Sequence, residues 1–222
     1  MHTGFPVDIV LLALVAGFLV LRLRSVLGRR TGFERPPMPE PSAGGGAPRP
    51  VGPPVIDGVA EPSRPARPVP ASHTVVGQAL ARIAAAERGF DPVRFLETAE
   101  GSFRRVVLAF AAGNVAVLRS LLTPAVLATF EQAITARNAA GETQHTEILR
   151  VIETTIDEAD IIGGEAVIVV RFVSDQQNFT RDGHGQVIAG TESMTEMIDL
   201  WTFEKQLGAA DPTWRLAAAR SG

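Results

Sequence analysis

The sequence contains no cysteine, no tyrosine, only four histidines and a single lysine, Lys205. Without cysteine the chain has no disulfide, no thiolate metal site and no cysteine nucleophile, which fits a reducing compartment. With no tyrosine and few histidines, the chain is short of the side chains most often used for proton transfer near neutral pH. The composition therefore argues against an enzyme before any motif is considered.

The chain has 222 residues, of which 45% are hydrophobic, so it can hold one domain with a real core and some additional segments. Its charge is uneven, because the part before Thr74 carries about +3 and the part after it about −6. A protein that neutralises phosphates needs a basic face. The acidic second part therefore argues against nucleic acid as a partner.

An apolar run occupies residues 5–21, and Asp8 is its only charged residue. At 1.5 Å per residue the run spans about 25 Å, which suffices for a bilayer core if flanking arginines snorkel. Basic residues follow the run, whereas a cleaved signal peptide has them in front. We therefore predict a retained single-pass anchor within residues 1–30. Its apolar positions include Phe5, Ile9, Leu12, Val15, Leu19 and Leu21.

Four arginines follow the apolar run directly: Arg22, Arg24, Arg29 and Arg30. Because basic residues beside a membrane span remain on the cytoplasmic side, they predict that everything after them is cytoplasmic. The arginine- and alanine-rich composition is typical of a bacterial GC-rich genome. The predicted location is therefore the bacterial inner membrane, with the C-terminal domain in the cytoplasm.

Residues 31–73 are rich in proline and glycine and show no hydrophobic period. Proline interrupts helices and central strands, and the segment has too little apolar surface to offset the entropy of ordering. We predict a disordered linker, which acts as a spacer or as a proline-rich ligand for an aromatic groove. It would reach about 35 Å if flexible and about 120 Å if fully extended.

Helical spacing begins after the linker. Apolar residues recur every three or four positions from residue 76 to Gly89, which predicts an amphipathic helix. Leu80 and Ile83 lie beside Arg82 and Arg88 on this helix. The helix is therefore a candidate membrane contact, although it could equally pack on its own domain.

Two pairs of an N-cap residue and a proline, Asp91-Pro92 and Thr123-Pro124, predict helix starts, and Gly113-Asn114 predicts a helix boundary between them. The first of these helices has one apolar face, formed by Leu96, Ala99, Phe103, Val107 and Phe110. The first third of the domain is therefore predicted to be helical.

Beyond Gly141 β-branched residues become frequent and the hydrophobic period falls to two. We predict strands over residues 146–156, 166–174, 191–204 and 214–218, with turns at 163–164 and 182–183. Helices followed by an antiparallel meander indicate an α+β fold over residues 74–222. A long curved sheet wrapping the helices would form a cone with an interior pocket, as in the nuclear-transport-factor-two-like fold.

Large apolar residues in the helices and strands are candidates for the core or for a pocket wall. Met197, Trp201 and Phe203 share one face of a predicted strand, which is the pattern of sheet-to-helix packing. The alternative is a pocket for an apolar ligand, such as a lipid tail or a segment of a client protein. The full candidate set is Phe103, Phe110, Met197, Trp201, Phe203 and Trp214.

Five short segments in order together resemble the Tim44-like domain family, which includes the mitochondrial inner-membrane import-motor tether and bacterial relatives. They are FDPVRFL at 90–96, VVLAFAAGN at 106–114, LLTP at 121–124, WTFEK at 201–205 and DPTWRL at 211–216. Residues 21–32, LRLRSVLGRRTG, also resemble the anchor region of alphaproteobacterial members. The resemblance covers about two thirds of the chain.

This resemblance implies a non-catalytic, membrane-associated adaptor acting in protein translocation or membrane-protein quality control. The expected partners are membrane lipid and a protein such as a chaperone or translocation component. The chain departs from the mitochondrial relative by its transmembrane anchor and by lacking a long helical chaperone-docking region. The chaperone-holding role of the mitochondrial relative is therefore the feature that transfers least to this chain.

Two other readings remain open: an enzyme of the same cone fold acting on a small apolar substrate, and a secretion-system scaffold, which would place the domain outside the cytoplasm. Acid or base candidates for an enzyme are Asp199, Glu196 and Glu153. The single histidines His73, His145 and His184 show no spacing that suggests a metal site. We therefore assign no catalytic, cofactor-binding or metal-ligating residue.

Overall fold

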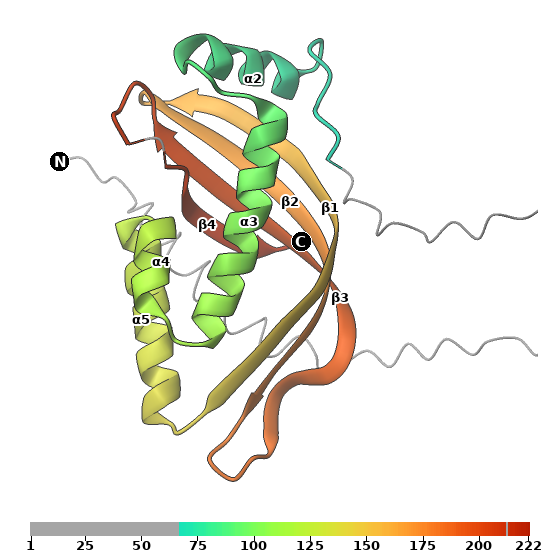
Figure 1. Ribbon diagram of the computed structural model, residues 1–222, viewed down its shortest axis with the longest axis vertical. Coiled ribbons are helices and arrows are strands. Elements are labelled where there is room, and N and C mark those ends of the chain that lie inside the picture. The colour runs from blue at the N-terminus through green and yellow to red at the C-terminus, as the bar shows by residue number, and fades with distance from the viewer. Residues whose placement is uncertain (1–66, 212) are drawn as a thin grey trace, which may run out of the picture. The chain divides into compact units, whose positions relative to one another are not determined.

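The computed structural model describes residues 67–211 and 213–222. Within these residues four helices come first and four strands follow, and together they form an α+β domain (Figure 1). The predicted anchor, its basic flank and most of the predicted linker lie outside the described residues. Within the part that is described, no helix is both long and apolar enough to cross a membrane. The predicted α+β class of the C-terminal domain is confirmed.

The helices are α2 (Val75–Ala86), α3 (Pro92–Ala111), α4 (Val115–Leu121) and α5 (Pro124–Ala139). The predicted starts at Asp91-Pro92 and Thr123-Pro124 are confirmed. The Asp91 carboxylate accepts a hydrogen bond from the Arg94 amide at 2.8 Å. Because this bond satisfies an amide that the first helical turn leaves without a partner, Asp91 fixes where the chain enters α3.

The strands form one antiparallel sheet in the order β1-β2-β3-β4. They are β1 (Thr143–Ile162), β2 (Glu165–Arg181), β3 (Val187–Gln206) and β4 (Arg215–Ser221). The turn between β1 and β2 uses Gly163 and Gly164, whose φ values of 59° and 88° suit a residue without a Cβ. Register shifts interrupt the pairing of β1 with β2 at three places, and such bulges bend a sheet. All four strands extend beyond their predicted C-terminal ends.

The centre of the core lies between α3 and the curved sheet (Figure 1), and α2, α4 and α5 also contribute buried residues to it. Phe103 of α3 stacks on Phe172 of β2 with ring centroids 4.5 Å apart, and it meets the edge of Trp201 of β3 at 4.9 Å. All three side chains are buried. The apolar face predicted for this helix therefore points inward, with Phe110 half-buried at its far end.

Helix α2 takes the second of the two options that its amphipathic pattern left open. Leu80 and Ile83, proposed as a membrane contact, are 3% and 0% exposed and belong to the core. Arg82 forms an exposed ion pair with Asp160 of β1 at 3.2 Å, and Arg88 is exposed. The apolar face of α2 packs on its own domain, so it offers no side chains to a bilayer in this conformation.

The packed unit also begins earlier than predicted. Arg67, which lies within the predicted linker, forms an ion pair with Glu100 of α3. Glu100 is 8% exposed and also accepts hydrogen bonds from Arg104 at 3.3 Å. Because a shielded carboxylate needs cationic partners, this pair holds the last residues of the predicted linker against the domain.

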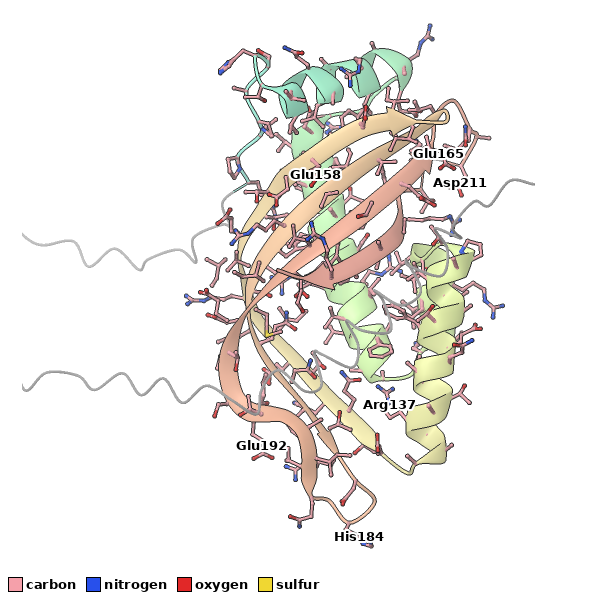
Figure 2. All side chains as sticks on the ribbon, turned by 180° about the vertical axis from the view of Figure 1, so that it is seen from behind. Arg137, Glu158, Glu165, His184, Glu192 and Asp211 are labelled. Carbon is pink, nitrogen blue, oxygen red and sulfur yellow. The ribbon has the colours of Figure 1, made fainter. Side chains whose placement is uncertain are left out.

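Arg137 at the end of α5 joins three elements (Figure 2). Its guanidinium donates to the carbonyls of Phe110 and Ala111 at 2.9 and 3.1 Å and to the side chain of Gln144 on β1. Burial lowers the pKa of Arg137 from its usual value. The Gly113 and Asn114 amides already cap the end of α3 by donating to the Phe110 and Ala109 carbonyls, so Arg137 adds a tie from α5 and β1 to this capped end.

Candidate functional site

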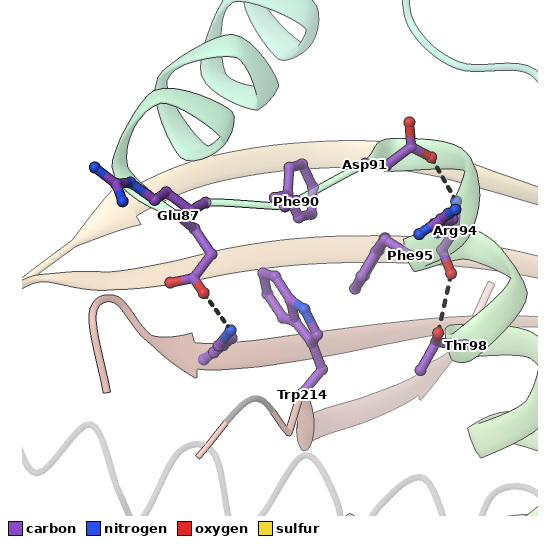
Figure 3. Close-up of a pocket in the computed structure, with 10 residues that line it drawn as sticks. Glu87, Phe90, Asp91, Arg94, Phe95, Thr98 and Trp214 are labelled. Carbon is purple, nitrogen blue, oxygen red and sulfur yellow. Dashed lines mark hydrogen bonds and ion pairs between the residues drawn. The ribbon is translucent and has the colours of Figure 1, made fainter. Parts of the chain in front are cut away.

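A pocket of about 240 Å³ lies where the loop from α2 to α3, the first turns of α3 and the end of β3 meet (Figure 3). Trp214, just before β4, closes one side of it. Its walls combine three aromatic rings, one shielded ion pair and two exposed arginines. The lining residues belong to two segments, 87–98 and 205–214, which are more than a hundred residues apart in sequence, so only the fold brings them together.

The aromatic wall is formed by Phe90, Phe95 and Trp214. The ring centroids of Phe95 and Trp214 are 4.8 Å apart in an edge-to-face arrangement, and Phe90 lies 6.0 Å from Phe95 and 5.8 Å from Trp214. Phe95 is buried and meets Phe203 of the core edge-on at 5.9 Å. The wall is therefore fixed to the core at Phe95, while Phe90 and Trp214 remain partly exposed.

The ion pair joins Glu87, after α2, to Lys205 near the end of β3. Lys205 Nζ donates to Glu87 Oε1 at 2.7 Å, and the Gly208 amide donates to Glu87 Oε2 at 3.2 Å. The side chains of Lys205 and Glu87 are only 6% and 17% exposed. The hydrogen bond from Lys205, followed by that from Gly208, lowers the pKa of Glu87. The only lysine of the chain is thus committed to this pair.

Arg88 and Arg94 supply the positive charge of the pocket. Both are exposed, and in the described part of the chain neither guanidinium forms an ion pair or a hydrogen bond with another side chain. The pocket therefore has three basic side chains and two acidic ones. This balance is opposite to that of the whole chain, which has 24 acidic and 21 basic residues.

The pocket offers rings and cations to a ligand more directly than it offers carboxylates. Here the Glu87 carboxylate already accepts from Lys205 and Gly208, and the Asp91 carboxylate accepts from the Arg94 amide. The aromatic rings and the two arginines are therefore the groups best placed to meet a ligand.

The structure divides the aromatic residues that the sequence singled out. Phe103, Trp201 and Phe203 are in the core, at 0–2% exposure, whereas Met197 is partly exposed on β3. Trp214 lines the pocket together with Arg88, a residue from a different predicted set. Five other lining residues were not predicted as site residues, although the segment FDPVRFL contains three of them: Glu87, Phe90, Arg94, Phe95 and Lys205.

The three acid or base candidates for an enzyme do not come together. Asp199 is fully buried and accepts a hydrogen bond from Gln176 at 3.4 Å. Glu196, at an odd spacing from Asp199 along β3, faces the opposite side of the sheet and is exposed. Glu153 forms an ion pair with Arg171 at 3.5 Å. The arrangement offers no pair of groups with complementary acid and base roles.

The histidines are also separate from one another. His145 stacks on Phe179 with ring centroids 4.9 Å apart, and Figure 2 shows His184 at the tip of the hairpin formed by β2 and β3. His73 is exposed before α2. Among the residues that the structure describes, no three His, Asp or Glu side chains are grouped closely enough to hold a metal ion.

Three solved structures with a similar fold share little sequence with this chain. The intermembrane space region of the chloroplast protein ARC6 is 10% identical, with a TM-score of 0.42 over 57% of this chain and 95% of that one. A protein assigned as a ketosteroid isomerase from Shewanella frigidimarina is 15% identical, with a TM-score of 0.30 over 55% of this chain and 92% of that one. A protein assigned as a dehydratase of the NTF2-like family from Streptomyces avermitilis is 12% identical, with a TM-score of 0.32 over 57% and 94%.

No curated protein matches the sequence at a significant level. The family comparison gives a different result, because residues 76–221 match the Tim44-like domain. The matched range begins in α2 and ends with β4, so it includes the pocket, the core and the complete sheet. It also contains the five segments on which the sequence resemblance was based. Since the match covers well over half of this chain, the chain belongs to the Tim44-like domain family.

Proposed function

We propose that this protein is a membrane-anchored, non-catalytic adaptor that binds a protein partner at the cytoplasmic face of the bacterial inner membrane. The observation that carries the proposal is the pocket, whose aromatic wall and unpaired arginines suit binding while both of its carboxylates are already engaged. The partner would be a chaperone or a component of protein translocation or membrane-protein quality control.

The predicted anchor and linker complete this proposal. Residues 5–21 would hold the chain in the bilayer, and the linker would keep the domain near the membrane without fixing its orientation. The ion pair of Arg67 with Glu100 sets where the linker would leave the domain. Family membership supports a role at a membrane but identifies no partner.

An enzyme of the same fold is less well supported. Its best acid or base, Asp199, is 0% exposed and shares its face of β3 with Trp201 and Phe203, both buried. A substrate would therefore have to displace core side chains to reach the carboxylate. Such a rearrangement would cost several kcal/mol of packing.

The topology of the proposal can be tested with two fusions after Gly222. A phosphatase that is active only outside the cytoplasm should be inactive there, whereas a fluorescent protein should be fluorescent. An active phosphatase in the full-length chain would refute the cytoplasmic placement. It would favour the secretion-scaffold reading instead.

Partner binding can be tested by photo-crosslinking in intact membranes. A crosslinking amino acid at Thr98, which lines the pocket, should give a discrete protein adduct. The same group at Gln132, an exposed position on α5, provides the matched control. Equal adducts from both positions, or none from Thr98 at any expression level, would contradict a partner site at the pocket.

A further inference from the structure

We infer that the pocket binds an acidic peptide segment, in which one aromatic side chain enters beside Phe90 and Trp214 and flanking carboxylates meet Arg88 and Arg94. This inference rests on the adaptor proposal and names the chemical class of its partner. Three observations lead to it: the size of the pocket, the nature of its walls and the position of its charges.

The size of the pocket limits its occupant to about one ring. Sites for drug-sized molecules usually measure about 300–1,000 Å³, whereas this pocket has about 240 Å³. A lipid with two acyl chains would need a longer apolar channel than three rings can provide. A single large side chain of a peptide fits these dimensions, because the rest of the peptide stays outside.

The walls favour an aromatic side chain. Aromatic rings prefer edge-to-face or offset contacts with centroids about 4.5–7 Å apart. Phe95 and Trp214 already meet in this way, and Phe90 completes a wall of tilted rings. Phe90 and Trp214 keep exposed ring surface toward the pocket, so an incoming ring can extend the same pattern.

The charges favour carboxylates on both sides of that ring. Arg88 precedes Phe90 by two residues and Arg94 follows it by four, and both arginines line the pocket together with the three rings. Neither has a partner among the described side chains, while Lys205 is neutralised by Glu87. An acidic segment would meet two cations here that no described side chain neutralises, on a chain whose formal net charge is −3.

A phosphate group is disfavoured at the same place. Phosphates commonly bind the amides at a helix N-terminus, and α3 begins at this pocket. That position is already occupied by Asp91, whose carboxylate accepts from the Arg94 amide and carries its own negative charge. A phospholipid headgroup or a nucleotide would be repelled there, whereas peptide carboxylates can reach the flexible ends of the two arginines.

The test uses the full chain in detergent and an eight-residue peptide with one phenylalanine flanked by glutamates. The chain has two tryptophans, and Trp201 is 2% exposed, so Trp214 should report on the pocket. We expect a saturable change in tryptophan fluorescence at peptide concentrations up to several millimolar. The change should be lost with a peptide in which alanine replaces phenylalanine, and it should weaken when glutamines replace the glutamates.

Protein variants locate the site. Arg88→Ala with Arg94→Ala should weaken peptide binding between about two- and thirty-fold, the sum expected for two exposed ion pairs. Arg105→Ala removes an equally exposed arginine of α3 outside the pocket and should leave the affinity unchanged. Because all three side chains are exposed, their replacement should not alter the circular dichroism spectrum.

Each outcome decides the question. Equal binding by the double variant and the Arg105→Ala control, or no saturable binding at all, would overturn the inference. Displacement of the peptide by anionic phospholipid added to the detergent micelles, with phospholipid binding that needs the same arginines, would overturn it in favour of lipid. If the peptide fails while the Thr98 crosslink persists, the adaptor proposal stands and only the acidic-peptide assignment falls. If both fail, the adaptor proposal falls as well.

Discussion

Replacing Phe103 by alanine tests whether α3 is held to the sheet by the aromatic stack that the structure shows. The ring is 0% exposed, lies 4.5 Å from Phe172 at an interplanar angle of 15° and meets the edge of Trp201 at 4.9 Å. Removing a buried phenylalanine usually costs about 3–5 kcal/mol, and each aromatic pair is worth about 0.5–1.5 kcal/mol beyond its area. We therefore expect a loss near the upper end, about 4–5 kcal/mol.

Urea unfolding of a fragment containing residues 67–222 measures this loss. With a slope of about 2 kcal/mol per molar urea, the midpoint should fall by about 2 M. Leu108→Ala on the same helix is the matched control, because Leu108 is 47% exposed and its loss should stay below about 1 kcal/mol. Equal losses for the two variants would refute the placement of Phe103 between the helix and the sheet.

Three further predictions concern charged groups. Arg67→Ala should destabilise the domain by about 1–3 kcal/mol, because Glu100 would lose one cationic partner in a shielded place; an unchanged urea midpoint would contradict this. Because the pKa of Glu87 is lowered, its pair with Lys205 stabilises the fold above about pH 4.5, and this stabilisation is lost as the pH falls through the folded-state pKa. Glu87→Gln should therefore reduce the change of the urea midpoint with pH in this acidic range. Burial and a neighbouring carboxylate raise the pKa of Glu204, so Glu204→Gln should raise the urea midpoint at pH 7 and lose this advantage at pH 4.

The helices were predictable because their signals are local. Asp91, Asn114 and Thr123 each precede the helix that they cap, and the apolar face of α3 follows the helical period. The strands were predicted too short because their ends depend on pairing with a neighbouring strand, which gives no local signal. At Gln176 and Asn178 polar side chains continue β2, paired with β1 through a ladder whose register the sequence does not reveal. Hydrogen bonds between strands, rather than apolar alternation, hold these positions in the sheet.

The pocket was only partly predictable. Trp214 was singled out as large and apolar, but its partners Phe90 and Phe95 are more than a hundred residues earlier, and no periodicity links them. The pair of Glu87 with Lys205 joins the end of a helix to the end of a strand, so it becomes visible only when the fold is known. The exposed arginines would be ordinary surface residues without the rings between them. The two options left open for the apolar face of α2 have a similar cause, because amphipathic spacing cannot distinguish a core from a bilayer.

The small size of the pocket explains why an anchored adaptor would depend on its anchor. Burying one aromatic side chain contributes about 2–3 kcal/mol, and two exposed ion pairs add about 0.2–1 kcal/mol each. A total near 4 kcal/mol corresponds to a Kd of about 1 mM, which is too weak to hold a dilute partner in solution. Confinement by a flexible tether raises the effective concentration toward the millimolar range. Deleting residues 5–21 should therefore leave peptide affinity unchanged and abolish the crosslink from Thr98 in cells. A released domain that keeps this crosslink would show that the pocket, or a surface around it, binds far more tightly than its dimensions predict.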